Sequence, residues 1–261
     1  LSYTEGGFSG AGYYDGTIAA ASYQLASGTK NLRYSYDPMG QISNAENVSR
    51  PDENLGVKEP IQYDPNGNFL SIKRGDKSVQ YRYHDHTERV SQVLDQSSGA
   101  ILASCDLYDG NGNVKHYIEA QNQSLPGHDL TFEYDPLSSR AVRITDAEAD
   151  RNTLLLRYGS DDERVLKEVQ EGGRTLYKKL YLRGLNSYPL CELTNDGSTR
   201  SVVYIYGPGG LISLDKNNVT YGVIKDHLGS VRALVDQQSQ VVASYDYQTF
   251  GSLTDVNEPG A

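Results

Sequence analysis

Three residues toward the C-terminal end of the sequence could perform acid–base chemistry. Asp226, His227 and Arg232 could act as an acid, a base and a cation around a substrate. The alternative is structural, because an Asp in a turn bonds its own backbone and an Arg on the next strand can form an ion pair or a stacking contact. Strand alternation directs Arg232 away from Val231 and Ala233, which favours the structural role. We therefore predict no catalytic residue here.

Two other clusters contain residue types that bind metals. Asp109–Asn113 begins like a calcium loop, but the sixth position is Val114 instead of Gly and the twelfth is Ala120 instead of Glu. His84 and His86 would share a face of a strand and could hold a metal ion, yet they fall where a repeated turn is expected. We predict turns at both places, with no metal and no cofactor.

The remaining reactive residues do not define a site. Aspartate occurs in nearly every predicted turn, so no pair of carboxylates can be singled out for glycoside hydrolysis. The sequence contains no Gly-x-Ser-x-Gly elbow and no His-Glu-x-x-His motif. Cys105 and Cys191 permit at most one disulfide, and whether they pair stays open. Asn-x-Ser/Thr acceptors at Asn47, Asn122 and Asn218 matter only if a eukaryotic cell secretes the chain.

The composition excludes several classes of protein. The 261 residues include 24 Lys+Arg and 34 Asp+Glu, a net charge of −10 without a basic run, which argues against nucleic-acid binding. Apolar runs such as Thr17–Ala21 are far shorter than the roughly 20 residues of a spanning helix. Leu1–Gly10 shows no signal-peptide pattern, and the missing initial Met leads us to expect a fragment. The unusual feature is 21 Tyr beside 4 Phe and no Trp.

The tyrosines mark an internal repeat. Each copy has Tyr-x-Tyr-Asp or a shortened form of it, then a turn rich in Pro, Gly and Asn, then an apolar residue. Successive key tyrosines are 27, 20, 25, 26 and 24 residues apart, a period typical of stacked repeats. The clearest copies contain Tyr36-Asp37, Tyr63-Asp64, Tyr83, Tyr108-Asp109 and Tyr134-Asp135, and weaker ones contain Tyr158, Tyr204-Ile205-Tyr206, Tyr245-Asp246-Tyr247 and the degenerate Tyr13-Tyr14-Asp15.

Each copy predicts a β-hairpin. Tyr-x-Tyr is typical of a strand with both rings on one face. The following Asp, with Pro, Asn or Gly, forms a turn. The clearest predicted hairpin joins Ser230–Val235 to Val241–Tyr247 through the polar turn Asp236–Gln240. Asp161–Glu171 has a partial helical spacing, but glycines flank it as in the other repeats, so we predict a strand.

The predicted fold class is all-β, with stacked β-hairpins in one array over residues 1–261. Two segments depart from the repeat and are predicted loops. Thr145–Thr153 is rich in Ala, Asp and Glu, and Arg50–Pro60 contains two prolines and a Gly. Neither resembles a domain linker, so we predict a single domain.

A longer motif lies in residues 204–251. Lys225-Asp226-His227-Leu228-Gly229-Ser230-Val231-Arg232 is followed by Tyr245-Asp246-Tyr247 and then by Phe250-Gly251. This order resembles the RHS-associated core segment of RHS (rearrangement hot spot) proteins, and the Tyr-Asp units resemble their YD repeat. The resemblance spans roughly Tyr34 to Gly251. It implies that the motif residues named above are structural.

The resemblance also implies an architecture and partners. RHS proteins wind β-hairpins into a spiralling sheet that closes into a hollow shell. The shell encloses a C-terminal toxin in bacterial polymorphic toxins and in the C component of insecticidal toxin complexes, and teneurins are similar proteins of animal cell surfaces. The expected partners are the rest of the same shell and an enclosed effector or a companion toxin component. The expected location is secreted or extracellular, in a bacterium.

One family feature is missing from the sequence. Bacterial RHS cores end in a self-cleaving Asp-Pro-x-Gly type motif, and none follows Gly251. Asp37–Gly40 and Asp64–Gly67 have these letters but lie in N-terminal repeat turns. We therefore assign no self-cleavage to this chain, and expect any such site beyond residue 261.

Three functions follow as hypotheses. The first is a non-enzymatic structural segment that forms a β-shell around a C-terminal effector. The second is a carbohydrate or cell-surface binding module, because rows of Tyr can stack on sugars, although packing between hairpins explains the same rows. The third is part of a self-cleaving or polysaccharide-active enzyme. We favour the first.

Overall fold

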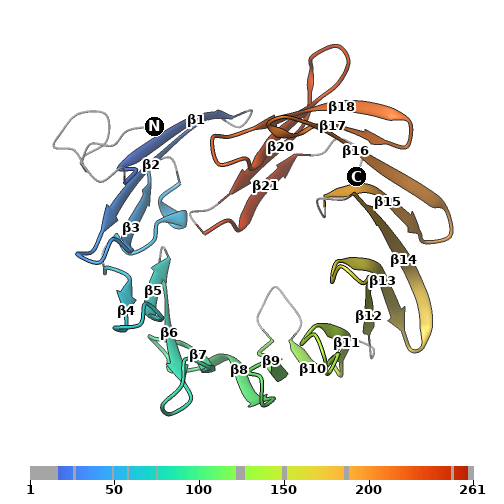
Figure 1. Ribbon diagram of the computed structural model, residues 1–261. Coiled ribbons are helices and arrows are strands. Elements are labelled where there is room, and N and C mark those ends of the chain that lie inside the picture. Colours follow the sequence, from blue (N-terminus) through green and yellow to red (C-terminus); the bar gives the residue numbers. More distant parts are fainter. Residues whose placement is uncertain are drawn as a thin grey trace. The chain divides into compact units, whose positions relative to one another are not determined.

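The computed structural model describes residues 17–25, 28–48, 50–57, 59–74, 76–121, 127–148, 152–184, 188–247 and 250–257. The degenerate repeat at Tyr13-Tyr14-Asp15 lies outside these residues. Within them the chain forms β-strands and one short 3-10 helix, with no α-helix, and no helix that is long and apolar enough to cross a membrane. The all-β prediction is therefore confirmed (Figure 1).

The chain divides into two compact units, residues 1–104 and 105–261, and the boundary falls within strand β8. The first unit contains β1 (Ala20–Leu25), β2 (Gly28–Tyr36), β3 (Ile42–Asn47), the 3-10 helix η1 (Pro51–Glu53), β4 (Gln62–Tyr63), β5 (Phe69–Arg74), β6 (Lys77–Tyr83), β7 (Val90–Asp95) and the start of β8 (Ile101–Tyr108). The prediction of one array over residues 1–261 stays a prediction.

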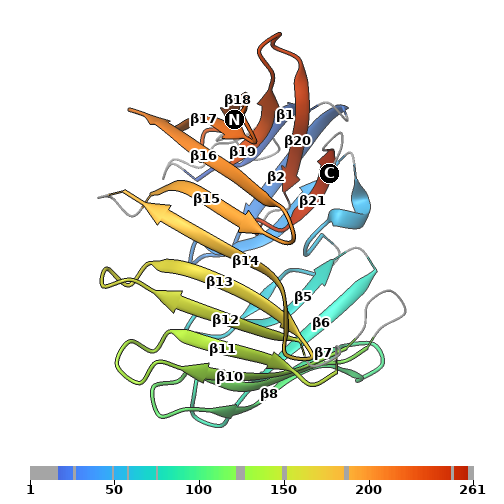
Figure 2. The ribbon, with the colours of Figure 1, turned by 90° about the vertical axis from the view of Figure 1, so that its right-hand side faces the viewer.

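The second unit contains the remaining strands in chain order. They are β9 (Val114–Glu119), β10 (His128–Tyr134), β11 (Ala141–Asp146), β12 (Thr153–Tyr158), β13 (Arg164–Glu171), β14 (Arg174–Arg183), β15 (Pro189–Asn195), β16 (Thr199–Gly207), β17 (Gly210–Lys216), β18 (Val219–Lys225), β19 (Val231–Val235), β20 (Val241–Tyr247) and β21 (Leu253–Asn257). Each strand from β9 to β21 pairs antiparallel with the next, as the side-by-side ribbons of β10 to β16 show in Figure 2.

Aspartates build the recurring turns. In five turns, at Asp37, Asp64, Asp109, Asp226 and Asp236, the Oδ1 atom accepts the backbone N–H groups two and four residues later. The fourth residue of each turn has a positive φ, which Gly tolerates best: Gly40, Gly67, Gly112, Gly229 and Ser239. The repeated turn therefore has the pattern Asp-x-x-Gly, and its second position has a backbone conformation that Pro can adopt. The Asp-Pro-x-Gly letters at Asp37 and Asp64 form hairpin turns.

Two of the strand predictions are confirmed and one loop needs adjustment. Arg164–Glu171 forms strand β13, and β19 and β20 form the predicted C-terminal hairpin. The predicted loop Thr145–Thr153 is too long, because β11 continues to Asp146 and β12 begins at Thr153. Thr145 and Thr153 are paired with each other across the two strands, so the hairpin extends further than the composition indicated.

The prediction of a loop at Arg50–Pro60 is wrong in its centre. Pro51–Glu53 forms η1, and Leu55 makes isolated β-bridges to Ala45 of β3 and Arg74 of β5. Leu55 is only 1% exposed and forms a core cluster with Ala45 and Ile61, against which Tyr34, Ile42, Tyr63, Phe69 and Ile72 pack. The segment is therefore the centre of the first unit's hydrophobic core.

A buried polar network holds this segment beside β2 and β3. Lys30 and Glu53 form an ion pair at 3.3 Å between Nζ and Oε2, with both side chains almost fully buried. The Asn47 amide donates to the same Glu53 oxygen at 2.7 Å, and Arg50 pairs with the other oxygen at 3.1 Å. Because Glu53 satisfies three donors at once, its burial is compensated by hydrogen bonds and charge.

Candidate functional site

The C-terminal motif forms the hairpin turn between β18 and β19 and the strands beside it. Asp226 begins the turn, and its Oδ1 accepts the N–H groups of Leu228 and Ser230 at 2.9 and 3.0 Å. Gly229 completes the turn with φ +88°. Both positions are fixed by local backbone chemistry, so Asp226 and Gly229 have a structural explanation.

Arg232 on β19 is clamped between two carboxylates. Its Nε atom lies 2.9 Å from Asp226 Oδ2, and one terminal nitrogen lies 3.3 Å from Asp246 Oδ1 on β20. The side chains of Asp226 and Asp246 are only 4% and 6% exposed, and that of Arg232 is 14% exposed. Asp246 also accepts the N–H of Tyr247 at 2.8 Å. The guanidinium therefore links two buried carboxylates that come from different elements.

Tyr247 completes this cluster. The guanidinium carbon of Arg232 lies 5.0 Å from the centre of the Tyr247 ring, a cation–π distance. The Tyr247 hydroxyl donates to the backbone oxygen of Val231 at 3.0 Å. We call Asp226, Arg232, Asp246 and Tyr247 the arginine clamp.

The arginine clamp does not assemble acid–base chemistry. Burial raises the pKa of Asp226, but the hydrogen bond from Ser230 and the pairing with Arg232 outweigh it and hold that pKa below its usual value. His227 is exposed and makes no hydrogen bond with the part of the chain that the structure describes. The acid, base and cation of the enzymatic hypothesis are therefore not brought together, and the geometry is that of a buried structural link.

The other residues of the motif lie outside the arginine clamp. Leu228 is 75% exposed and Phe250 is 46% exposed, while Gly251 takes a positive φ of +83°. Tyr245 lies on β20, half-buried. Local folding thus accounts for the turn and the ion pairs but not for the identity of the exposed His227-Leu228 pair.

Tyrosine hydroxyls link one repeat to the repeat before it. Seven tyrosines at the last or next-to-last position of a strand donate to a backbone oxygen at 2.6–3.0 Å, and the acceptor is the first residue of the preceding strand or, for Tyr36, lies two residues before it. The pairs are Tyr36–Ile18, Tyr63–Ile42, Tyr83–Phe69, Tyr134–Val114, Tyr158–Ala141, Tyr206–Pro189 and Tyr247–Val231. The register of the hairpin shifts at each of these tyrosines, and such bulges can redirect a side chain.

Three of these tyrosines also lie near the turn Asp of the preceding copy. Burial raises the pKa of Tyr63, Tyr83 and Tyr134, and the charges of Asp37, Asp64 and Asp109, respectively, add to it. The hydroxyls therefore stay protonated and remain donors. The arginine clamp follows the same plan, with Arg232 placed between a turn Asp and the next copy's Tyr.

The remaining predicted repeat residues lie where the repeat places them. Tyr108 ends β8 and Asp109 begins the next turn, while Asp135 begins a turn one residue longer, which closes at Arg140. The Asp135 carboxylate accepts the N–H groups of Leu137 and Ser138, and these bonds lower its pKa.

The two candidate metal clusters are turns. Asp109 uses Oδ1 for the backbone of Asn111 and Asn113 and Oδ2 for the Asn113 amide at 2.9 Å. His84 begins a turn that closes at Arg89, and His86 takes a positive φ of +58° within it. Among the described residues no group of three or more His, Cys, Asp or Glu could hold a metal ion.

A histidine cluster on β8 to β11 was not predicted. His116 lies between two carboxylates, with Nδ1 2.7 Å from Asp106 and Nε2 2.7 Å from Asp129. His128 Nδ1 lies 2.6 Å from Asp146 Oδ2. The residues are 10 to 18 positions apart in the sequence, so no local motif could have found them.

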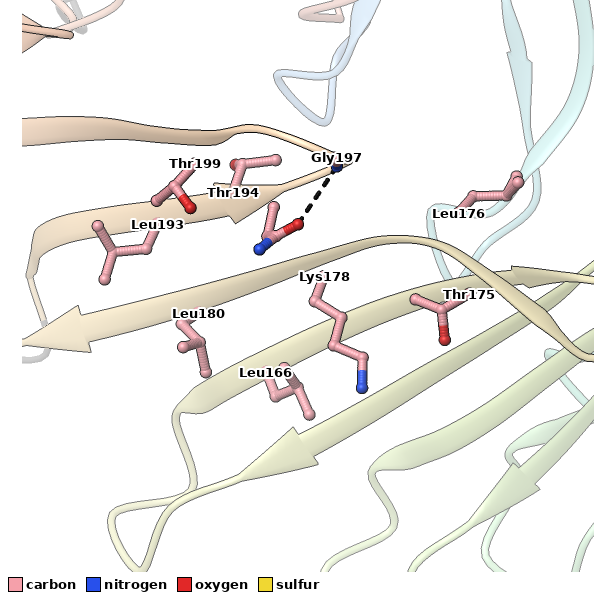
Figure 3. A pocket seen from close by; sticks show the side chains of 10 residues that line it. Leu166, Thr175, Leu176, Lys178, Leu180, Leu193, Thr194, Gly197 and Thr199 are labelled. Carbon is pink, nitrogen blue, oxygen red and sulfur yellow. Dashed lines mark hydrogen bonds between the residues drawn. The ribbon is translucent and has the colours of Figure 1, made fainter.

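An apolar groove of about 560 Å³ lies across β13 to β16 (Figure 3). Leu166, Leu180 and Leu193 occupy paired positions on three neighbouring strands and line it together with Leu176. Lys178, also in the lining, lies 3.2 Å from Glu168, whose pKa is lowered to about 2 by hydrogen bonds from Thr175 and Gln170. The groove combines an apolar floor with one satisfied ion pair.

Cys105 and Cys191 are not joined in a disulfide. Burial raises the pKa of the Cys105 thiol above its ordinary value. A thiol with a raised pKa is a poor nucleophile at neutral pH, which agrees with a structural role.

Comparison with known proteins identifies related sequences. A family model described as Teneurin YD-shell matches residues 14–260. Salivary gland surface protein 1 of Aedes aegypti is 30% identical over 208 residues, which make up 76% of this chain and 6% of that protein.

Solved structures with similar chains come from Tc toxins. The Tc holotoxin pore of Photorhabdus luminescens, with a substituted TccC3, covers 94% of this chain at 13% identity and a TM-score of 0.39. A crystal structure of TcdB2-TccC3-TEV covers 94% at 16% identity and a TM-score of 0.35. The chain spans 18% of each of these chains and 6% of the mosquito protein.

Proposed function

The chain belongs to the teneurin YD-shell family, and on that premise we propose that it is a non-enzymatic wall segment of a shell that encloses an effector polypeptide. The wall is built from hairpins that reuse two devices. A turn begun by Asp closes five of the described hairpins, and a tyrosine hydroxyl links seven of the described strands to the strand before it. A wall needs recurring joints because each hairpin contacts only its neighbours.

The tyrosine hydroxyl bonds are the observation that carries this proposal. Seven of them recur along both units at corresponding positions. Their hydroxyls are occupied within the sheet, which favours a mechanical role for these residues over the binding of sugars. The buried pairing of Asp226 with Arg232 likewise favours structure over catalysis.

The apolar groove on β13 to β16 is suited to an enclosed polypeptide. Leu176 and Leu180 are 43% and 48% exposed, and Leu182, which follows Leu180 on the same face of β14, is 56% exposed. A contiguous apolar surface of this kind marks an interaction site in a water-soluble protein. We propose that the effector, or a companion component, covers it.

We propose an extracellular location. The mosquito relative is described as a surface protein, and the toxin relatives are parts of assembled toxin complexes. The sequence analysis led to the narrower hypothesis that the host is a bacterium. The sequence that flanks this chain in the same open reading frame would test that hypothesis.

Limited proteolysis of the complete protein tests the enclosure. A shell protects the effector as long as the wall is folded, so the effector and the YD repeats should become cleavable together when urea is raised. The variant Arg232→Met should lower the urea concentration at which both are cut. An effector that is digested at once while the repeats stay intact would show that the wall encloses nothing.

A further inference from the structure

The tip of the β17–β18 hairpin presents an asparagine to solvent in a defined way. Lys216 pairs with Val219, so Asn217 and Asn218 form a two-residue turn. Their φ values are +55° and +68°, as a type I′ turn requires. Asn218 begins the sequence Asn218-Val219-Thr220, an acceptor for N-linked glycosylation.

The two asparagines of this turn have different surroundings. Asn217 is used by the fold: its Oδ1 accepts the N–H of Ser201 at 3.0 Å, and its own N–H donates to the Ser201 oxygen at 3.0 Å. Asn218 is exposed, and only its backbone N–H is bonded, to Asp215 Oδ1 at 2.8 Å. Its side-chain amide makes no hydrogen bond with the described residues. Substitution of this amide nitrogen therefore removes no contact.

The middle residue of the acceptor sequence is exposed as well, and the third is partly buried. Val219 is 48% exposed. The Thr220 hydroxyl lies 3.3 Å from Asp215 Oδ2 at the edge of the same turn. A glycan on the turn would therefore extend from the end of the hairpin, beyond the last paired residues of β17 and β18.

The other acceptor sequences provide a contrast. Asn47 is 2% exposed, and its amide nitrogen donates to Glu53 in the buried network of the first unit. A glycan on that nitrogen would have to displace Glu53 and break the network. Asn122 lies outside the described residues.

We propose that Asn218 is a site of N-linked glycosylation and that Asn47 is not. The donor would be a dolichyl-diphosphate oligosaccharide, the substrate of the oligosaccharyltransferase of eukaryotic secretion. The Asn218 amide nitrogen bonds to the anomeric carbon and loses a proton, while the bond from that carbon to the phosphate oxygen breaks and dolichyl diphosphate leaves. The inference rests on the proposed extracellular location, in a eukaryotic host.

A glycan at this position also restricts assembly. A branched oligosaccharide at the β17–β18 tip would keep this end of the two strands in solvent. A companion protein should therefore bind elsewhere on the second unit, such as at the groove on β13 to β16.

Secretion of the chain from cultured insect cells, behind an added signal peptide, tests the proposal. The double variant Ser49→Ala/Ser124→Ala keeps only the Asn218 acceptor without changing any asparagine. The double variant Ser124→Ala/Thr220→Ala keeps only Asn47. We expect peptide-N-glycosidase to increase the gel mobility of the first protein and to leave the second unchanged. Deglycosylation in ¹⁸O-water should label position 218 as aspartate in the peptide mass spectrum.

Two outcomes would overturn the proposal. One is an unmodified Asn218 in the secreted protein that keeps only this acceptor. The other is a glycan on Asn47 in secreted protein whose circular dichroism shows folded β-structure. The added signal peptide directs both variants into the secretory pathway. If the glycosylation proposal fails in this experiment, the proposed extracellular location is therefore not affected. The location is tested separately, by antibody labelling of unpermeabilised source cells.

Discussion

At the residue scale, the excess of Tyr over Phe is explained by a hydroxyl with a structural task. A ring alone would serve packing, and Phe would do so equally well. The strand-ending tyrosines instead satisfy a backbone oxygen of the preceding copy, as Tyr134 does for Val114 at 2.6 Å. The sequence predicted the strand and the ring but not the bond, because the acceptor is a main-chain atom about twenty residues away, which no side-chain pattern reveals.

Tyr134→Phe should lower the free energy of unfolding by about 1 kcal/mol, because the partly buried oxygen of Val114 loses its donor while the packing is kept. Urea unfolding followed by tyrosine fluorescence measures the change. Tyr177→Phe is the matched control, since the Tyr177 hydroxyl makes no hydrogen bond with the described residues, and it should stay within about 0.5 kcal/mol of the parent. Equal losses in the two variants would contradict the role of the hydroxyl.

The histidine cluster predicts a pH dependence of stability. The pKa of His116 is raised, mainly by the hydrogen bond to Asp129 and further by Asp106, although partial burial of the ring acts in the opposite direction. The bond to Asp146 raises the pKa of His128, with a contribution from the nearby Glu119. A neutral imidazole could donate to only one of the two carboxylates that flank His116. The bridge that His116 forms between Asp106 and Asp129 therefore requires the protonated ring.

The sign follows from the raised pKa values. The stabilisation by His116 and His128 is complete below the unfolded-state pKa of about 6.5 and is lost as the pH rises through the folded-state values. Urea midpoints between pH 5.5 and 8.5 should therefore fall more steeply for the parent than for His116→Gln/His128→Gln. The exposed His227→Gln is the control and should keep the parent slope. A midpoint of the parent that rises over this range relative to the double variant would refute the role of the bridge.

At the element scale, turns were predictable and the core segment of the first unit was not. Asp-x-x-Gly turns satisfy their own backbone within five residues, so the letters at Asp64–Gly67 are sufficient. Leu55 lies in a Pro- and Gly-containing stretch without strand periodicity. Its bridges reach Ala45 and Arg74, on different strands. Tertiary pairing therefore outweighed a local composition that is typical of a loop.

Alanine substitutions at two glycines with positive φ distinguish the cost of backbone strain alone from the cost of strain combined with steric overlap. At Gly40, φ is +78° and an added Cβ meets nothing within 4 Å, so Gly40→Ala should cost about 1 kcal/mol of stability. At Gly56, φ is +69° and the added Cβ would overlap the backbone oxygen of Ser43 and lie 3.1 Å from the Ile61 nitrogen. Gly56→Ala should therefore cost about 3 kcal/mol or more.

Differential scanning fluorimetry and urea unfolding of the two variants measure this difference. Gly99→Ala provides a second open control, because Gly99 also has a positive φ and nothing within 4 Å. If Gly56→Ala were no more destabilising than Gly40→Ala, the segment around Leu55 would not be held as tightly as its bridges and burial indicate.

At the scale of the whole molecule, the pairing of each strand with its chain neighbours determines how far the destabilisation of one hairpin extends along the sheet. Each strand of the second unit pairs with its chain neighbours, so stability should behave as a sum of hairpin and interface contributions. The repeat period alone led to this expectation from the sequence. The sequence also allowed an ion pair between Arg232 and the turn residue Asp226, but it could not show that Asp246 joins this pair, because Arg232 and Asp246 approach each other only after β19 and β20 pair.

Arg232→Met should loosen the C-terminal hairpins and leave the distant ones protected. The substitution leaves the buried carboxylates of Asp226 and Asp246 without their cation, which costs about 3 kcal/mol and corresponds to roughly 100-fold faster amide hydrogen exchange where opening is local. Hydrogen exchange followed by mass spectrometry should show this increase in β18 to β21 and little change in β10 to β13. Arg143→Met removes only an exposed pair with Glu133 and should change exchange little in any strand. An equal increase from β10 to β21 would mean that the unit opens as one cooperative body, and the nearest-neighbour description of the wall would then be wrong.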